Sequence, residues 1–246
     1  MVKRLLMFVL LMVSFHFVFA DDEPGRLNIK NVDVGQARLC VFRPYGLIAL
    51  SKGQLVSIDV KEELPRLSQA VEADDIYQLE QDVIFKCGEA LLDANLDTLA
   101  NFDTSEYRLF PVQNDDIFFL VMSTDSVSCI FTFNVLGQET ELLLKTQEPV
   151  VYVCGISSDF YLVTETHIYR YSDKGGLCMM TYFEPIRSAA LTSMGLFFAT
   201  DHNLLLLCGI NEVNVILKES VSRLYANGDV LYVHFSDNTI GKYELP

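Results

Sequence analysis

The chain has 246 residues, of which 50% are hydrophobic and 21% charged, with few Gly and Pro and no Trp. This composition is typical of a globular protein with a large core, and it excludes a disordered or collagen-like chain. The formal net charge of −15 excludes nucleic acid and anionic lipid as general partners, since both would repel the protein.

The first twenty residues have the pattern of a secretory signal peptide. Lys3 and Arg4 form a short basic start, an apolar run covers residues 5–19, and Val18 and Ala20 occupy the −3 and −1 positions of a cleavage site. The run is shorter than the roughly 20 residues that a bilayer span requires, which favours a cleaved leader over an anchor. We therefore predict a leader over 1–20, a short acidic N-terminus over 21–26, and export to the periplasm or the extracellular space, with no membrane attachment after cleavage.

Six short polar turns recur along the remaining chain, each between two apolar runs. The turns are Ser51–Gln54, Cys87–Ala90, Ser123–Ser126, Thr164–His167, Thr200–Asn203 and Ser236–Thr239. Their first residues are separated by 36, 36, 41, 36 and 36 positions. A fixed period of this length indicates a repeat architecture.

The positions around each turn are apolar in every unit. Four residues after the turn start, the chain has only aliphatic side chains: Leu55, Leu91, Val127, Ile168, Leu204 and Ile240. Five residues before it, four units have Gly46, Asp82, Asp159 or Gly195, as a tight turn requires. Each unit therefore predicts a β-hairpin whose first strand is covered on both faces.

Further apolar segments complete each unit. An upstream position occupied by Cys40, Ile76, Val112, Val153, Ala189 and Tyr225 predicts an innermost strand, and segments 141–145, 177–183 and 213–217 predict outer strands. Four strands in about 36 residues are typical of a propeller blade. The last unit ends before its outer strand, and we expect Leu27–Val32 to supply it and so close the ring. We expect the five extra residues of the longest interval near 134–138 or near 174–176.

In these repeats the chain resembles the six-bladed β-propeller class. Secreted NHL- and YWTD-type propellers are nearest in chain length and in location outside the cytoplasm. The resemblance implies a single all-β domain over residues 27–246. It rests on period and patterning, because no unit contains a YWTD or Trp-Asp signature, so the subfamily stays open. A β-sandwich or a five-bladed ring is the competing fold.

The resemblance also implies that the starts of the innermost strands surround one mouth of a central channel. The position thirteen residues before each turn is occupied by Arg38, Asp74, Phe110, Val151, Arg187 and Arg223. Closure of the ring would make the first, fifth and sixth units neighbours, so we predict a ligand-binding cluster of Arg38, Arg187 and Arg223. Guanidinium groups bind carboxylate or phosphate through paired hydrogen bonds. The alternative interpretation is that each Arg pairs with an acidic side chain of a neighbouring blade.

The sequence contains no G-x-S-x-G elbow, Gly-rich phosphate loop or H-E-x-x-H motif. It favours a non-catalytic binding module for a protein, peptide or glycan partner, with no cofactor or metal. Whether the protein is an enzyme stays open, with a non-enzyme favoured. Two alternatives stay open: a structural or sensor component of an envelope assembly, and a metal-dependent propeller hydrolase or lactonase. We expect the six cysteines to be mostly free thiols, with one or two disulfides as the alternative.

Overall fold

The computed structural model describes residues 25–27, 32–42, 46–59, 64, 67, 69–80, 82–112 and 117–245. Within these ranges every regular element is a β-strand, and there is no helix of a length and hydropathy suited to crossing a bilayer. The predicted leader over 1–20 lies outside the described residues, as do residues 21–24.

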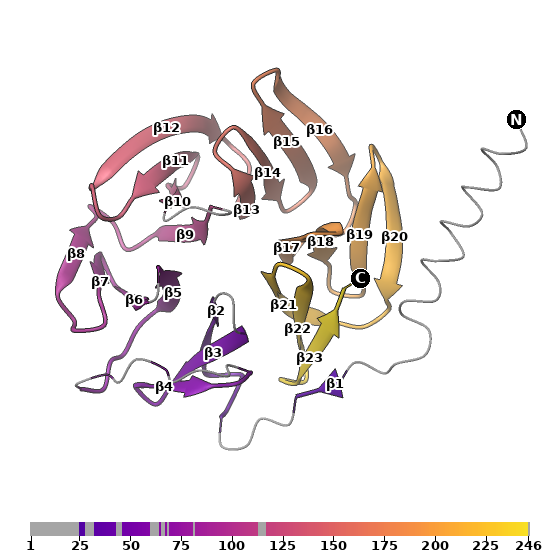
Figure 1. Ribbon diagram of the computed structural model, residues 1–246. Helices are drawn as coiled ribbons and strands as arrows, with labels where there is room; N and C mark the ends of the chain where they lie inside the picture. The colour runs from indigo at the N-terminus through magenta and orange to yellow at the C-terminus, as the bar shows by residue number, and fades with distance from the viewer. Residues whose placement is uncertain are drawn as a thin grey trace, which may run out of the picture.

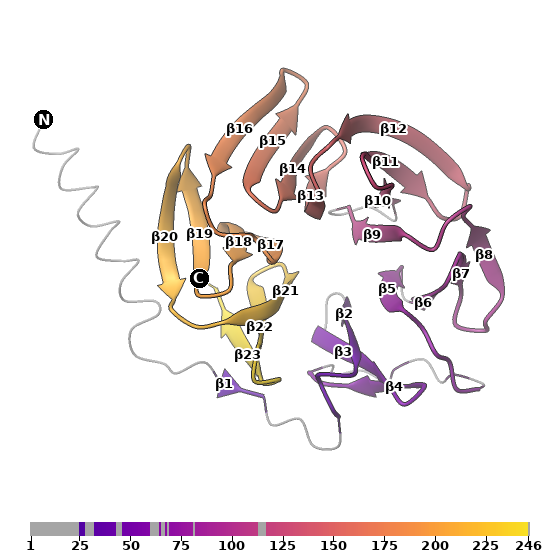
Figure 2. The ribbon, with the colours of Figure 1, turned by 180° about the vertical axis from the view of Figure 1, so that it is seen from behind.

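Six antiparallel sheets stand around a common centre (Figure 1; Figure 2 shows the reverse side). The first strand of each sheet lies innermost, and each innermost strand contacts that of the next sheet, including the last with the first. Each sheet is one blade, numbered 1 to 6 here in chain order. The chain is a six-bladed β-propeller, which confirms the prediction from the repeats.

Each blade follows the chain from its innermost strand outwards, and blade 6 takes its outer strand from the N-terminal end of the chain. Blade 1 contains β2 (Arg38–Phe42), β3 (Gly46–Ser51) and β4 (Gln54–Ser57); blade 2 contains β5 (Asp75–Leu79), β6 (Asp82–Cys87), β7 (Ala90–Leu92) and β8 (Thr98–Asn101); blade 3 contains β9 (Tyr107–Pro111), β10 (Ile117–Ser123), β11 (Ser128–Asn134) and β12 (Glu139–Thr146). Blade 4 contains β13 (Val150–Ile156), β14 (Asp159–Thr164), β15 (His167–Ser172) and β16 (Gly175–Thr181); blade 5 contains β17 (Ser188–Thr192), β18 (Gly195–Ala199), β19 (Leu204–Gly209) and β20 (Glu212–Leu217); blade 6 contains β21 (Val221–Asn227), β22 (Val230–Phe235), β23 (Ile240–Glu244) and β1 (Gly25–Arg26).

The six polar turns of the sequence each connect the second and third strands of a blade. Gly46, Asp82, Asp159 and Gly195 are each the first residue of a second strand, as their spacing predicted. The longest repeat interval falls in the outer hairpin of blade 3, where β11 and β12 are 7 and 8 residues long and flank residues 135–138. The expected place near 134–138 is therefore right, although longer strands share the extra length with the loop.

The hydrophobic core is divided into six clusters, each filling the space between two adjacent blades. The second strands contribute most, because they are buried on both faces: in β10, residues Phe118 to Val121 are all at most 2% exposed. This double burial is the physical reason for the uninterrupted apolar runs in the sequence.

Blades 6 and 1 meet where the two ends of the ring join. Strand β1 pairs antiparallel with β23, opposing Gly25 to Lys242 and Arg26 to Gly241, and the Leu27 amide donates to the Ile240 carbonyl at 2.9 Å. An N-terminal strand thus closes the ring as predicted, but it begins upstream of the expected Leu27–Val32 segment, of which residues 28–31 lie outside the described ranges.

A polar contact reinforces the same seam. Asp59, just after β4 of blade 1, accepts a hydrogen bond from the Tyr232 hydroxyl at 3.2 Å and forms an ion pair with Lys242 at 2.7 Å, both from blade 6. Because the Asp59 and Lys242 side chains are only 24% and 25% exposed, the pair is shielded more than an ordinary surface ion pair.

All six cysteines are free thiols in this structure. Cys154 is buried, and burial raises the pKa of its thiol far above the ordinary value. Cys178 and Cys208 are exposed on β16 and β19. The expectation of mostly free thiols agrees with this arrangement.

His234 on β22 is the exception in an otherwise apolar repeat position. The equivalent residues, two before each turn start, are Ala49, Phe85, Val121, Leu162 and Phe198, all buried. His234 is 9% exposed, and burial lowers its pKa below 6.5, assisted by Arg223 and opposed by Asn238 and Asp237. Because the unfolded chain then binds the proton more readily than the native one, the free energy of unfolding should fall as the pH drops below about 6.5.

We expect His234→Phe, which matches Phe85 and Phe198, to remove this pH dependence. Urea unfolding at pH 7.5, 6.5 and 5.5 should show the wild type losing up to about 1.4 kcal/mol per pH unit relative to the variant. Parallel pH profiles for the two proteins would show that His234 is not buried in its neutral form.

A candidate binding site in the central channel

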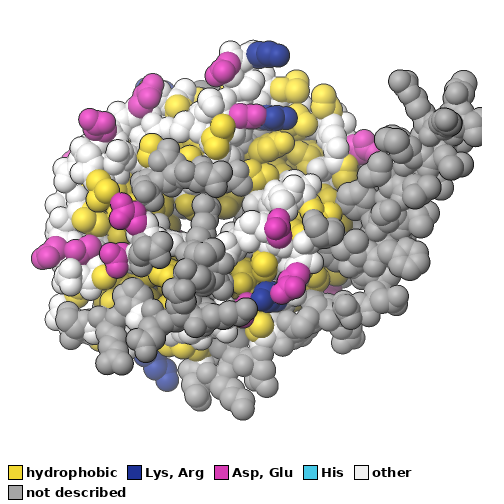
Figure 3. All heavy atoms as spheres, in the orientation of Figure 1, with side chains coloured by type: hydrophobic (Ala, Val, Ile, Leu, Met, Phe, Trp, Pro, Cys, Tyr) yellow, Lys and Arg dark blue, Asp and Glu magenta, His cyan; other side chains and the backbone are white. Residues whose placement is uncertain are grey.

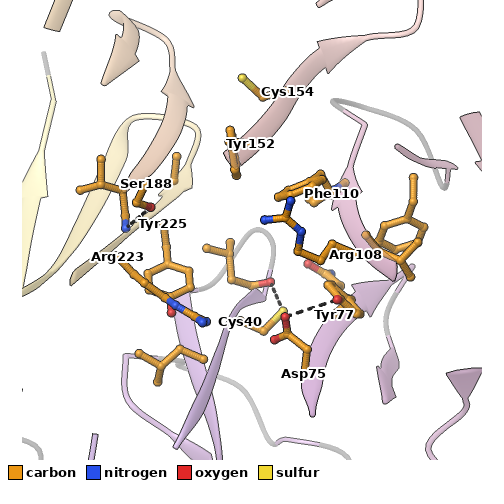
Figure 4. A pocket seen from close by; sticks show the side chains of 18 of the residues that line it. Cys40, Asp75, Tyr77, Arg108, Phe110, Tyr152, Cys154, Ser188, Arg223 and Tyr225 are labelled. Carbon is orange, nitrogen blue, oxygen red and sulfur yellow. Dashed lines mark hydrogen bonds between the residues drawn. The ribbon is translucent and has the colours of Figure 1, made fainter. Parts of the chain in front are cut away.

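The innermost strands enclose a pocket of about 720 Å³ along the central channel (Figure 4). All six blades contribute to its lining, from β2, β5, β9, β13, β17 and β21. Pockets of 300–1,000 Å³ are of the size that holds a small molecule or a few residues of a peptide. The channel is therefore the natural place for a ligand.

Two of the three predicted arginines line this pocket. Arg223 projects from β21 of blade 6 and Arg187 directly precedes β17 of blade 5. Arg38 is exposed at the start of β2 and is not among the lining residues, although it lies near enough to Asp75 to help lower the pKa of that carboxyl. The fold thus brings Arg187 and Arg223 to one pocket and leaves Arg38 at its edge.

Arg187 is engaged by an acidic side chain. Its Nε and Nη2 donate to the two carboxylate oxygens of Asp201 at 3.0 and 3.1 Å. Asp201 belongs to the hairpin turn of the same blade, so the alternative interpretation applies to Arg187, though with a partner in its own blade. Hydrogen bonding to Asp201 raises the pKa of Arg187, and both side chains remain about half exposed.

The pocket contains an arginine that the repeat analysis missed. Arg108 on β9 of blade 3 points into the channel, and its Nη2 donates to the Val150 carbonyl of the next blade. Its guanidinium carbon lies 5.7 Å from the centre of the Phe110 ring, within the range of a cation–π contact. Burial, together with the positive charge of Arg223, lowers the pKa of Arg108.

Asp75 and Tyr77 of β5 line the same pocket, on the side of Arg108 and across from Arg223 (Figure 4). The Tyr77 hydroxyl donates to Asp75 Oδ2 at 3.3 Å, and the Ile76 amide donates to Oδ1 at 3.0 Å. Burial raises the pKa of Asp75 despite the opposing effect of this amide, Arg223, Tyr77 and Arg38. Asp75 is the one carboxylate at this end of the pocket lining, so the described channel has more positive than negative groups there.

Aromatic side chains form much of the remaining wall. The Phe110 and Tyr152 rings meet edge to face with centroids 5.1 Å apart, and Tyr77 contacts Phe118 in the same way at 6.0 Å. Burial raises the pKa of Tyr225 to about 12, so its hydroxyl stays protonated beside Arg223. The pocket therefore combines cations, hydroxyls and apolar ring faces.

A second polar cluster lies outside the channel lining, on blade 4. Glu148 accepts hydrogen bonds from Thr164, Tyr169 and His167 at 2.7, 2.8 and 2.9 Å. Partial burial acts to raise the pKa of Glu148, but these three hydrogen bonds outweigh it and the net pKa is lowered. In the described part of the chain, His, Cys, Asp and Glu form no group of three or more suited to a metal ion.

Comparison with known proteins gives the fold and no family. No protein-family model matches the chain, and no curated protein matches it in sequence. Among solved structures it is similar to the WD40 β-propeller domain of Doa1 (12% identity, 83% of this chain and 77% of that chain, TM-score 0.56). It is similar also to a catalytically inactive virginiamycin B lyase from Staphylococcus aureus with quinupristin (13% identity, 89% and 83%, TM-score 0.55).

A third similar structure is PorZ, a surface component of the type-IX secretion system of Porphyromonas gingivalis (12% identity, TM-score 0.50). The match covers 91% of this chain and 39% of PorZ, so the chain spans well under half of that protein's length. At these identities the comparisons support the β-propeller fold alone.

Proposed function

We propose that the protein is an exported, non-catalytic binding module that engages a protein or peptide partner through the arginine-lined mouth of its channel. The observation that carries the proposal is the gathering of Arg108, Arg187 and Arg223 around one pocket in a protein of net charge −15. The partner would present an anionic group to this mouth, since cations in a narrow, partly desolvated site favour bound carboxylates.

The surface charge supports a local rather than a general attraction. Acidic side chains are spread over the face in Figure 3, with Lys and Arg scattered among them. A partner must therefore bring its anionic group into the channel, where Arg108, Arg187 and Arg223 gather, and not merely meet the outer surface. Such a requirement provides specificity more than affinity. The signal-peptide pattern over 1–20 supports export, and the surface location of PorZ is consistent with it.

Affinity capture from the native envelope or culture fluid tests this function. With residues 21–246 as bait, we expect a partner that is retained by the wild type and lost from a variant combining Arg108→Ala, Arg187→Ala and Arg223→Ala. Arg38→Ala, at the edge of the pocket, should weaken capture less. Removal of charge-assisted hydrogen bonds costs about 1.5–3 kcal/mol each, which is tenfold or more in affinity.

Arg170→Ala is the matched control. Arg170 is an exposed arginine that pairs with Asp159 through two hydrogen bonds of 2.8 and 2.6 Å, and it is not among the channel-lining residues. A partner list that the triple variant shares with the wild type would contradict the channel site. Equal losses in the control and the triple variant would contradict it as well.

A separate observation favours a structural component of an envelope assembly as the second candidate. Large apolar side chains are exposed on or next to the outer strands: Leu142 on β12, Leu177 on β16, Val215 on β20, and Phe183 after β16, which is 85% exposed. Several large apolar side chains exposed on the outer strands of neighbouring blades favour a contact surface there. Capture that is insensitive to the channel arginines but lost on Phe183→Ser with Leu177→Ser would favour this candidate.

A further inference from the structure

Two arginines face each other across the channel from opposite sides of the ring. Arg108 belongs to blade 3 and Arg223 to blade 6, which are three blades apart in a ring of six (Figure 1). Both side chains are exposed and line the pocket, and the Asp75 carboxylate acts to raise the pKa of each. Their distance is short enough for Arg223 to affect the pKa of Arg108.

No carboxylate of the described residues forms an ion pair with either arginine. The ion pairs there join Glu148 to His167, Asp159 to Arg170, Asp201 to Arg187, and Asp59 and Glu244 to Lys242. Arg108 donates to a backbone carbonyl, and the Tyr225 side chain lies close enough to Arg223 to affect its pKa; both the carbonyl and the protonated hydroxyl are neutral. Two like charges facing each other in a confined site repel, and an anion bound between them would relieve that repulsion.

The channel changes character along its length. Asp75, Arg108 and Arg223 lie near the starts of β5, β9 and β21. The other end has no cation in the described lining and is mixed: the apolar Pro111, Leu191 and Ala226 lie there with the polar Gln78 and Glu80. The edge-to-face pair of Phe110 and Tyr152 lies between these two ends. A ligand that matches this arrangement has an anionic group at the arginines and an apolar group next to it, at the rings of Phe110 and Tyr152.

Resting on the proposed function, we propose that the channel binds the free carboxyl terminus of a peptide chain whose last side chain is apolar. Arg108 and Arg223 hold the two oxygens of the α-carboxylate from opposite sides. The terminal side chain packs against Phe110 and Tyr152. The Asp75 carboxylate, kept in place by Tyr77, accepts hydrogen bonds from peptide N–H groups as the chain leaves the mouth.

The remaining lining favours a peptide over a fatty acid, although both ligands carry a carboxylate. Tyr77, Tyr225 and Ser188 bring hydroxyl groups to the wall, and Gln78 and Glu80 of the β5 segment place polar groups at the far end of the channel. The Tyr77 hydroxyl donates to Asp75 and the Ser188 hydroxyl accepts from the Leu224 amide, but Tyr77 can still accept and Ser188 can still donate one hydrogen bond. A peptide backbone can use this remaining capacity, whereas a hydrocarbon chain cannot. The polar wall therefore selects for a ligand that is itself rich in hydrogen-bonding groups.

Selection from two peptide pools tests the proposal. One pool contains N-acetylated hexapeptides with a free carboxyl end, randomised at the first four positions and ending in two apolar residues, and the other contains the same peptides as carboxamides. Immobilised residues 21–246 should retain the free acids at least about tenfold more than the amides, as quantified by mass spectrometry. The difference should vanish with Arg108→Ala plus Arg223→Ala and persist with Arg170→Ala.

Two further measurements make each outcome decisive. Arg108→Lys with Arg223→Lys keeps the charges and should retain a preference for acids, which separates loss of charge from loss of folding. Equal retention of acids and amides by the wild type would overturn the proposal, as would arginine-dependent binding of dodecanoate without enrichment of any peptide. If a partner is nevertheless captured in an arginine-dependent way, the binding module stands and only the carboxyl-terminal mode is wrong.

Discussion

We expect Gly46→Ala to destabilise the native fold strongly at blade 1. Gly46 begins β3 with a φ of +152°, which side-chain-bearing residues rarely adopt. A Cβ atom there would lie 1.8 Å from the carbonyl oxygen of Asp59 and 3.4 Å from the Tyr232 hydroxyl. Since the Asp59 and Ile58 amides both donate to the Leu47 carbonyl, at 3.1 and 3.0 Å, the clashing backbone cannot move without losing these bonds and the seam contacts of Asp59.

The free energy of unfolding should fall by more than about 3 kcal/mol, which is the range expected for backbone strain combined with overpacking. Urea unfolding monitored by circular dichroism measures it. Gly88→Ala is the matched control, because Gly88 also has a positive φ, +61°, but a Cβ atom added there would meet no atom beyond its chain neighbours within 4 Å. The control should lose only about 1 kcal/mol. Equal losses at the two glycines would contradict the steric role of Gly46.

The repeat was readable from the sequence because the connection between the second and third strands is short in every blade, two or four residues long. Because the second strand is buried on both faces, an apolar run directly precedes this turn in every unit. The turn and the run therefore recur together with the same period. The position of Gly46 relative to the turn predicted the start of β3. The reason why glycine is needed there, the close approach of the Asp59 backbone, is seen only in the structure.

The channel site was only partly readable because the loop between the first and second strands varies in length. Counting back thirteen residues from each turn assumes a constant loop, and in blade 3 the segment from β9 to β10 runs over residues 112–116. The count therefore selected Phe110, which does line the pocket, and passed over Arg108 two residues earlier. The alternation of buried Tyr107 and Leu109 around Arg108 was the available signal, since it sets Arg108 on the opposite face.

Strand irregularities shift the remaining positions. In β21 the register slips between Val221 and Arg223, and in β13 between Val150 and Tyr152. A bulge of one residue changes which side chains face the channel, so Tyr152 lines the pocket beside Val151. Pairing partners such as Asp201 for Arg187 also depend on side-chain geometry that spacing does not encode.

A chain that begins at Asn28 should be markedly less stable than one that begins at Gly25. The two differ only in Gly25, Arg26 and Leu27, which supply strand β1 and the amide that donates to Ile240. Loss of this short pairing, together with the packing of Leu27 against the cluster between blades 6 and 1, should lower the free energy of unfolding by about 2–4 kcal/mol. Urea titration of the matched pair gives this difference directly.

The same truncation should change how the protein associates. Without β1, strand β23 becomes an unpaired edge, and exposed edges recruit strands from other molecules. We therefore expect the shorter chain to form concentration-dependent dimers or aggregates by light scattering while the longer chain stays dispersed. The Asp59 to Lys242 ion pair and the buried cluster between blades 6 and 1 remain in both proteins, so equal stability and equal dispersity would mean that these contacts, and not β1, hold the ring closed.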